Sequence, residues 1–301
     1  NINTDEIDLR DLLQILIDGK WIIVAVTSFI SIVGVLYSLY LPNIYESRAL
    51  LAPSAPANQP NILQSYGGLA NLAGIDISEG SESNDAQAIE KIKSLSFFET
   101  DFLPNIFLPD LMAYKMWNST TNEPVYDRKK YNEDTDLWVR KFSFPQMQIP
   151  SAQESFDKFI TKHLNINVDK KNNFVIVTIK HQSPYIAEKW TRLLIDQINS
   201  FYRKKDKNEA ERASNYLNML LVETNLVEIK EVIAALLQQE TKKLTLIQAN
   251  EFYVYEFIDP PAVMERKSQP KRTLICILAA LLGGMLGVVS VLVRYYIFAE
   301  K

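Results

Sequence analysis

Two long stretches without a charged residue dominate the pattern of polar and apolar positions. They cover residues 21–41 and 273–293, 21 residues each, and each contains twelve Leu, Ile, Val or Phe side chains. A helix of this length spans roughly 30 Å, the thickness of the hydrocarbon core of a bilayer. Side chains of these types favour membrane insertion. The pattern therefore predicts a transmembrane helix near each end of the chain.

Two other interpretations of these stretches are weaker. A core helix of a soluble protein rarely stays uncharged all round for so long. A signal peptide begins with basic residues, whereas the first stretch follows five acids: Asp5, Glu6, Asp8, Asp11 and Asp18. We therefore expect an N-terminal segment 1–20, spans 21–41 and 273–293, a central domain 42–272 and a tail 294–301, with both termini on one side.

Charge does not show which side that is. Near the spans the termini carry four Lys or Arg residues and the central segment five, and segments longer than about 60 residues translocate largely regardless of charge. The single cysteine, Cys276, lies inside the second span and forms no internal disulfide, so it does not indicate a redox compartment. A net charge of −4 on 301 residues argues against a nucleic-acid binder.

The central segment predicts a mixed α+β domain. Residues 45–51 and 253–258 have strand character, and since each lies next to a span we expect them to share one sheet. From residue 151 the pattern indicates a helix, a β-hairpin and another helix, with Ser183 as N-cap and Pro184 in the first turn. Between these parts we expect a Pro/Gly/Ser-rich loop with one short helix at 62–72, a helix capped by Asn84, and a loop-rich insert at 103–150.

A long helix is predicted over about 207–250, roughly 60 Å in length, starting at a capping box of Asp206 and Glu209. Six apolar residues follow the spacing of a coiled-coil seam: Met219, Val222, Leu226, Ile229, Ile233 and Leu236. This seam predicts packing against other subunits or an intramolecular helix, the alternative being a single long core helix.

Catalytic and metal-binding patterns are scarce. His163 and His181 lack a second ligand at metal-binding spacing, so we expect ordinary surface or core residues. Asp134 and Asp136 form a D-x-D pair that could hold a metal on a nucleotide-sugar phosphate, but such acids are usually solvated. Gly19–Lys20 lacks the rest of a phosphate-binding loop. We expect no enzyme, no metal and no cofactor.

Small residues recur every four positions in the second span, at Ala279, Gly283 and Gly287. They place a smooth face on which another helix backbone can approach closely, although glycine is common in membrane helices anyway. Pro270 breaks the chain before this span, and Lys271 and Arg272 suit the lipid headgroups. This end of the chain is predicted to serve assembly.

Several segments resemble the Wzz chain-length determinants, the bacterial polysaccharide co-polymerases. They are IDLRDLLQILIDGKW before the first span, YESRALLAPS after it, GGLANLAGI in the loop and FIDPPAVMERKSQPKRTLICILAALLGGMLG at the second span. By this resemblance, the proline- and glycine-rich motif of the family falls on Pro260, Pro270, Lys271, Gly283, Gly284 and Gly287.

The resemblance implies an inner-membrane protein with cytoplasmic termini and a periplasmic α+β domain that carries a long extended helix. It also implies a homo-oligomeric ring that sets the modal chain length of O-antigen, in lipopolysaccharide biosynthesis, or of a related glycan. The partners would be a Wzy-type polymerase and a lipid-linked polysaccharide. The related co-polymerases with a tyrosine kinase carry a cytoplasmic ATPase domain, whereas only residues 294–301 follow the second span here, so a kinase would act as a separate chain.

Two other function classes compete with this one. A capsule or exopolysaccharide export adaptor shares the two-span layout, but it needs a hairpin that crosses the periplasm, for which a helix of roughly 60 Å is too short. A membrane-bound sensor or enzyme would need a cytoplasmic output domain or a clustered site.

Overall fold

Two apolar helices near the ends of the chain form one unit, and a mixed α+β domain forms the other. The computed structural model describes residues 9–54, 84–250 and 252–298. The hairpin unit comprises residues up to Tyr45 and from Arg266, and the central unit is Glu46–Glu265. The expected helix at 62–72 lies outside the described residues.

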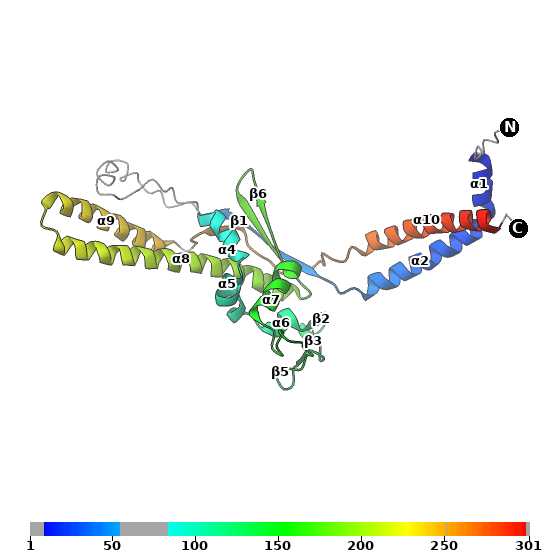
Figure 1. Ribbon diagram of the computed structural model, residues 1–301, viewed down its shortest axis with the longest axis horizontal. Coiled ribbons are helices and arrows are strands. Elements are labelled where there is room, and N and C mark those ends of the chain that lie inside the picture. Colours follow the sequence, from blue (N-terminus) through cyan, green and yellow to red (C-terminus); the bar gives the residue numbers. More distant parts are fainter. Residues whose placement is uncertain (1–8, 55–83, 251, 299–301) are drawn as a thin grey trace. The chain divides into compact units, whose positions relative to one another are not determined.

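The hairpin unit contains α1 (Leu9–Asp18), α2 (Lys20–Tyr40) and α10 (Arg272–Phe298), with α2 and α10 side by side (Figure 1). α2 and α10 are both long and apolar enough to cross a membrane. α2 ends before Pro42, which cannot continue a helix. Most of their large apolar side chains, such as Phe29 and Leu282, remain exposed in the chain. These two helices therefore do not form the buried core of a soluble domain.

The central unit is built on a four-stranded sheet in the order β6–β7–β1–β8. Its strands are β1 (Tyr45–Pro53), β6 (Leu164–Asp169), β7 (Phe174–His181) and β8 (Tyr255–Asp259). β6 and β7 form the predicted hairpin. β1 pairs antiparallel with β8, which confirms that the strands nearest the two spans share one sheet.

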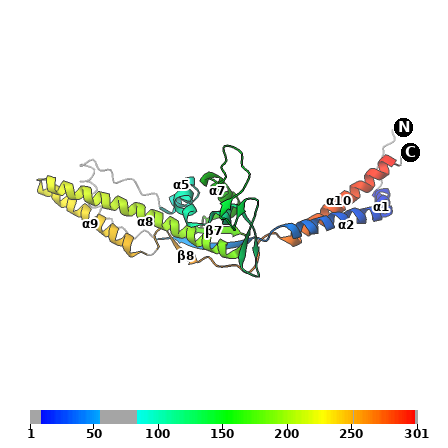
Figure 2. The same cartoon turned by 90° about the horizontal axis from the view of Figure 1, so that it is seen from below.

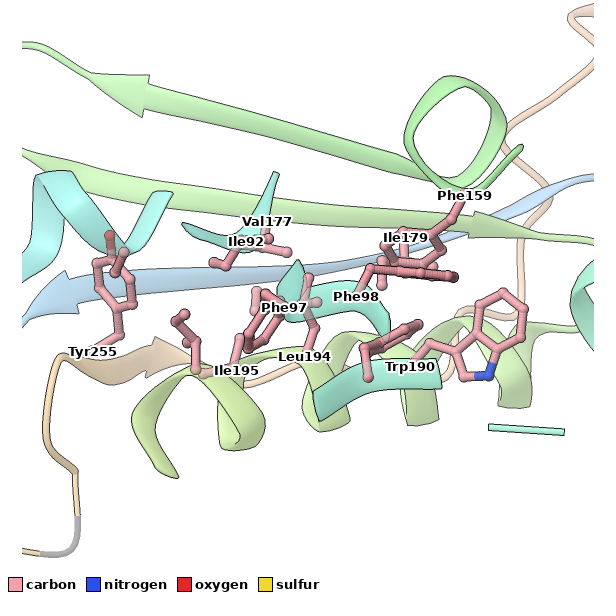
Figure 3. Close-up of a cluster of buried hydrophobic side chains, with 14 of the residues drawn as sticks. Ile92, Phe97, Phe98, Phe159, Val177, Ile179, Trp190, Leu194, Ile195 and Tyr255 are labelled. Carbon is pink, nitrogen blue, oxygen red and sulfur yellow. The ribbon is translucent and has the colours of Figure 1, made fainter. Parts of the chain in front are cut away.

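An apolar core lies between this sheet and the first half of α8 (Pro184–Glu223), as Figure 3 shows. α8 begins as predicted, with the Ser183 side chain accepting from the Ile186 N–H and Pro184 in the first turn. Trp190 packs edge-on against Phe102 and Phe159, whose ring centroids are 4.6 Å apart. Aromatic rings contribute large buried areas, so this cluster stabilises the unit strongly.

Short helices supply the rest of this core. They are α4 (Asn84–Ile92), α5 (Leu95–Phe97) and α7 (Ala152–Lys158), with π-helical turns at Phe98–Phe102 and Phe159–His163. The insert at 103–150 is more ordered than predicted, since it contains α6 (Leu108–Met112) and two small hairpins. These are β2 (Tyr114–Asn118) with β3 (Glu123–Tyr126), and β4 (Tyr131–Asn132) with β5 (Leu137–Trp138). Ala113, Tyr126 and Tyr131 form a small buried apolar cluster within this insert.

The prediction of one helix over 207–250 is wrong. α8 continues through Asp206 to Glu223, and after a break α9 (Val227–Ala249) runs back along it, forming a helical arm (Figures 1 and 2). Asp206 is buried within α8, where it accepts a hydrogen bond from the Tyr253 hydroxyl at 2.5 Å. Thr224 and Asn225, at the break, are weak helix formers, and reversing the chain lets each helix bury part of the other's apolar surface.

A buried asparagine connects α8 to β8. The Asn199 side-chain oxygen accepts from the N–H groups of Val254 (2.8 Å) and Tyr255 (2.9 Å), and its amide donates to the Tyr255 carbonyl at 3.0 Å. Because an unsatisfied buried backbone group is costly, these bonds fix where the chain leaves the arm and joins the sheet.

His181 is buried and His163 is half-buried, and the two rings stack on each other with centroids 5.6 Å apart. The Ser183 N–H donates to Nδ1 of His181 (3.0 Å), so Nε2 donates to the Asp110 carbonyl (3.2 Å). Nδ1 of His163 donates to the Lys180 carbonyl at 2.7 Å. Burial lowers the pKa of His163 to about 4 and that of His181 to about 3. The neighbouring Lys158 ammonium lowers both further.

This pair makes the stability of the central unit pH-dependent. Below pH 6.5 the imidazoles become protonated in the unfolded chain but stay neutral in the folded chain, because the pKa is lower in the folded state. The free energy of unfolding therefore falls as the pH drops from 6.5 toward 4. We expect a loss of roughly 2–4 kcal/mol between pH 7 and 5 from the two groups together. Thermal melting of the full chain in detergent, wild type against His163→Gln/His181→Gln, measures it. Equal shifts of Tm with pH in both proteins would contradict the assignment.

Candidate functional site

The small-residue face of α10 packs directly on α2 of the same chain. Gly283 and Gly287 are buried in this contact. A Cβ added at Gly283 would lie 3.0 Å from the Thr27 Cα, and one at Gly287 would lie 3.0 Å from the Ile23 Cα. Further along, Ala279 lies against Gly34. Backbone this close leaves no room for a larger side chain, so this face is occupied within the chain.

Gly284 differs from its neighbour. A Cβ there would meet only the Thr27 Oγ1, at 4.0 Å, which is an ordinary contact distance. Of the three glycines in the motif, two therefore hold the helices together and the third lies beside the contact.

The proline and basic residues of the motif divide between the two units. In the central unit, Pro260 is exposed after β8, while the carbonyl of the buried Pro261 accepts from the Arg192 guanidinium at 3.3 Å. Ser47 donates to the Ala262 carbonyl at 3.0 Å and so holds this strand exit beside β1.

In the hairpin unit, Pro270 immediately precedes two cations at the start of α10. The Asn43 side-chain oxygen accepts from Arg272 (3.1 Å) and from Lys267 (3.3 Å). Ile44 and Gln269 form an isolated antiparallel bridge. Lys271 is exposed. These contacts close the open end of the α2–α10 hairpin and bring Lys267 and Arg272 together on Asn43, beside the exposed Lys271.

The predicted coiled-coil seam does not lie on one helix, because the chain breaks at residues 224–226. Met219 and Val222 lie on α8, and Leu226 occupies the N-cap position of α9. Three residues lie on α9: Ile229, Ile233 and Leu236. Ile233 is buried and Leu236 is half-buried, so the intramolecular alternative holds for part of the set.

The other four seam residues form an exposed apolar tip. Met219, Val222, Leu226 and Ile229 are 45–84% exposed, and Tyr216 and Val227 extend the same surface. The sequence analysis missed these last two residues. Their signal was the weak helix pair Thr224–Asn225 flanked by apolar residues, which marks the end of a hairpin rather than the middle of a seam.

The residues considered for metal or phosphate binding make structural contacts and do not lie together in one site. Asp136 accepts a hydrogen bond from the Tyr131 hydroxyl. The Asp134 N–H donates to the Asn132 side chain in the turn. Gly19 packs on Val291 between α1 and α2. Among the described residues, no group of three or more His, Cys, Asp or Glu side chains is placed to bind a metal.

The chain thus combines a mixed α+β unit that carries a helical arm with a pair of apolar helices long enough to cross a membrane. Residues 5–100 match the family model described as "Chain length determinant protein" (Wzz), which bears out the resemblance for the segments around the first span and in the following loop. Residues 218–296 match a second model, described as "G-rich domain on putative tyrosine kinase". The first match covers α1, α2, β1, α4 and α5, and the second covers the end of α8, all of α9, β8 and most of α10.

Two solved structures are also similar. A "full-length bacterial polysaccharide co-polymerase" is 15% identical with a TM-score of 0.43, over 98% of this chain and 99% of that one. A fragment of WzzB, a polysaccharide co-polymerase from Salmonella Typhimurium, is 14% identical with a TM-score of 0.32, over 75% of this chain and 100% of the fragment. Both scores fall below 0.5, so only the two family models support the similarity to this family. A search of curated proteins found no match.

Replacing Gly283 by Leu should separate α2 from α10, because the new side chain has no space against Thr27. We expect a loss of about 1–3 kcal/mol, as for overpacked helix contacts. Gly284→Leu is the matched control, since it gains the same helix propensity without meeting a backbone. Thermal unfolding in detergent compares the two variants, and equal melting temperatures would contradict the close contact.

Proposed function

We propose that this chain is a non-catalytic membrane regulator that sets the modal chain length of a surface polysaccharide, O-antigen or a related glycan, made by a Wzy-type polymerase. The observation that carries the proposal is the match of residues 5–100 to the chain length determinant family.

The proposed location is the bacterial inner membrane, with both termini in the cytoplasm and the central unit in the periplasm. The exposed apolar surfaces of α2 and α10 need a hydrocarbon environment, because water would leave them uncovered. Two spans paired as a hairpin return the chain to the side on which it started. The choice of side follows the family.

The proposed working form is a homo-oligomeric ring in which arms of neighbouring subunits meet. The small-residue face of α10 is occupied by α2, so it is not available for this purpose. The exposed tip residues Met219, Val222, Leu226 and Ile229 are the surface that such contacts would cover. A lipid-linked polysaccharide and the polymerase would then meet an array of central units.

The test is a gel ladder of surface polysaccharide from the source bacterium, with the gene deleted and then restored. We expect the deletion to abolish the preferred length while polymer still reaches the surface, and the wild-type gene to bring the preferred length back. Restoration with Val222→Asp should give a broader distribution and a smaller purified assembly, because a charge is placed on the exposed tip. Asn208→Asp, on an exposed site of the same helix, is the control and should behave as wild type.

Polymer of normal length retained inside the deleted strain would contradict length control and favour an export adaptor. An unchanged ladder would contradict both functions.

A further inference from the structure

A loop of the insert, residues 139–149, presents apolar side chains to solvent; we call it the apolar loop. Phe144 is 97% exposed, and Phe142, Met147 and Ile149 are 52–60% exposed. Side chains of this kind normally stay in contact with other apolar groups. The loop lies between the segments matched by the two family models, so neither model assigns it a role.

The exposure of these side chains does not come from a loosely held chain. Polar contacts hold together the two ends of the loop, which we call its neck. The Arg140 side chain, only 13% exposed, donates from Nε to the Gln148 carbonyl (2.9 Å) and from Nη2 to the Met147 carbonyl (2.6 Å). Its guanidinium also pairs with the Glu154 carboxylate at 2.7 Å. The Gln148 amide donates to the Trp138 carbonyl at 2.5 Å. These bonds join both ends of the loop and direct its tip outward.

Charge is divided between the two ends of the β4–β5 hairpin next to the loop. The turn of the hairpin carries the acids Glu133, Asp134 and Asp136. The open end, where the Val139 N–H donates to the Lys130 carbonyl at 2.9 Å, carries one acid, Asp127, and four cations: Arg128, Lys129, Lys130 and Lys141. Residues 139–149 contain no acid. The aromatic tip therefore emerges at the basic end.

The insert lies at the end of the central sheet where the chain enters from α2. His181, the last residue of β7, contacts the Asp110 carbonyl and the Tyr114 ring of the insert. The preceding Lys180 pairs with Glu46, the first residue of the central unit, at 3.2 Å. In the chain, Glu46 follows α2 after residues 41–45.

We propose that the apolar loop inserts Phe142, Phe144 and Met147 into the surface of an anionic bilayer, with the adjacent cations at the lipid headgroups. Exposed aromatic and aliphatic side chains beside Lys and Arg are the composition of interfacial membrane-binding segments. Anionic lipids attract basic residues close to the surface. A stable protein partner would bury about 800 Å² on each side and would need a surface matched in shape to this tip. A lipid surface deforms around a tip and needs no matched groove.

This contact goes beyond the proposed control of chain length and does not depend on it. It rests on the hairpin unit being in a membrane, which the experiment checks separately.

The test uses the full chain in vesicles of phosphatidylcholine and phosphatidylglycerol. An environment-sensitive dye is placed at Ser143→Cys in a Cys276→Ser background, which keeps both phenylalanines of the tip. Asp134→Cys in the same background is the matched control, because it lies at the acidic end of the same hairpin. The wild-type Cys276 in α10, labelled alone, reports whether the hairpin unit is in the bilayer.

We expect spin-labelled lipid to quench the dye at position 143 at least about twofold more than at position 134. Adding Phe142→Ser and Phe144→Ser should reduce quenching at position 143 to the level at 134, and vesicles without phosphatidylglycerol should weaken it. Equal quenching at 143 and 134, with strong quenching at Cys276, would overturn the proposal and leave the membrane hairpin intact. Protection of position 143 from aqueous iodide without quenching by lipid would overturn it in favour of a protein contact.

Discussion

The close approach of α2 and α10 is the constraint on which the rest of the hairpin unit depends. Backbone packed on backbone at Gly283 and Gly287 holds two apolar helices together without a hydrophobic driving force between them, since lipid tails would cover either helix equally well. At the open end of the hairpin, the Asn43 side chain accepts hydrogen bonds from Arg272 and Lys267, where both segments of the chain leave the hairpin. The central unit is thereby attached through two neighbouring strands, β1 and β8, that already pair with each other.

In the central unit, too, a few contacts fix the position of long elements. Asn199 satisfies three backbone groups of the strand that returns from the arm, so the 40-residue α8 and the short β8 are positioned by one buried side chain. The arm can then project beyond the sheet, because its two helices bury Ile233 and Ile247 between themselves. The exposed large apolar side chains of the central unit include those at the tip of the arm and those of the apolar loop. Both are apolar surfaces supported by a well-packed base.

Much of this architecture was predictable from local patterns. Uninterrupted apolar runs, the Ser183–Pro184 helix start and the strand character next to each span are properties of neighbouring residues, and the structure contains each of them. The small-residue repeat of α10 likewise predicted a helix contact. It did not predict that the partner is α2, which lies more than 240 residues earlier in the chain.

What could not be predicted depended on residues distant in sequence. The spacing from Met219 to Leu236 fits a coiled coil, and only the packing of α9 on α8 shows that the chain reverses at Thr224. His163 and His181 look unremarkable on separate elements, yet the β6–β7 hairpin brings their rings together. The apolar loop was hidden in a Pro-rich insert, because its neck depends on Arg140 meeting Glu154 of the following helix.

Disulfide cross-linking in native membranes tests most directly whether α2 and α10 pair within one chain. Thr27→Cys is combined with Gly284→Cys in a Cys276→Ser background, since the Thr27 Oγ1 lies 4.0 Å from a Cβ at position 284. Thr27→Cys with the exposed Met285→Cys is the control. Pairing within the chain predicts efficient oxidation of the first pair to a cross-linked monomer and little cross-linking of the second. A covalent dimer as the main product of the first pair would show that the spans pair between chains and would contradict the hairpin.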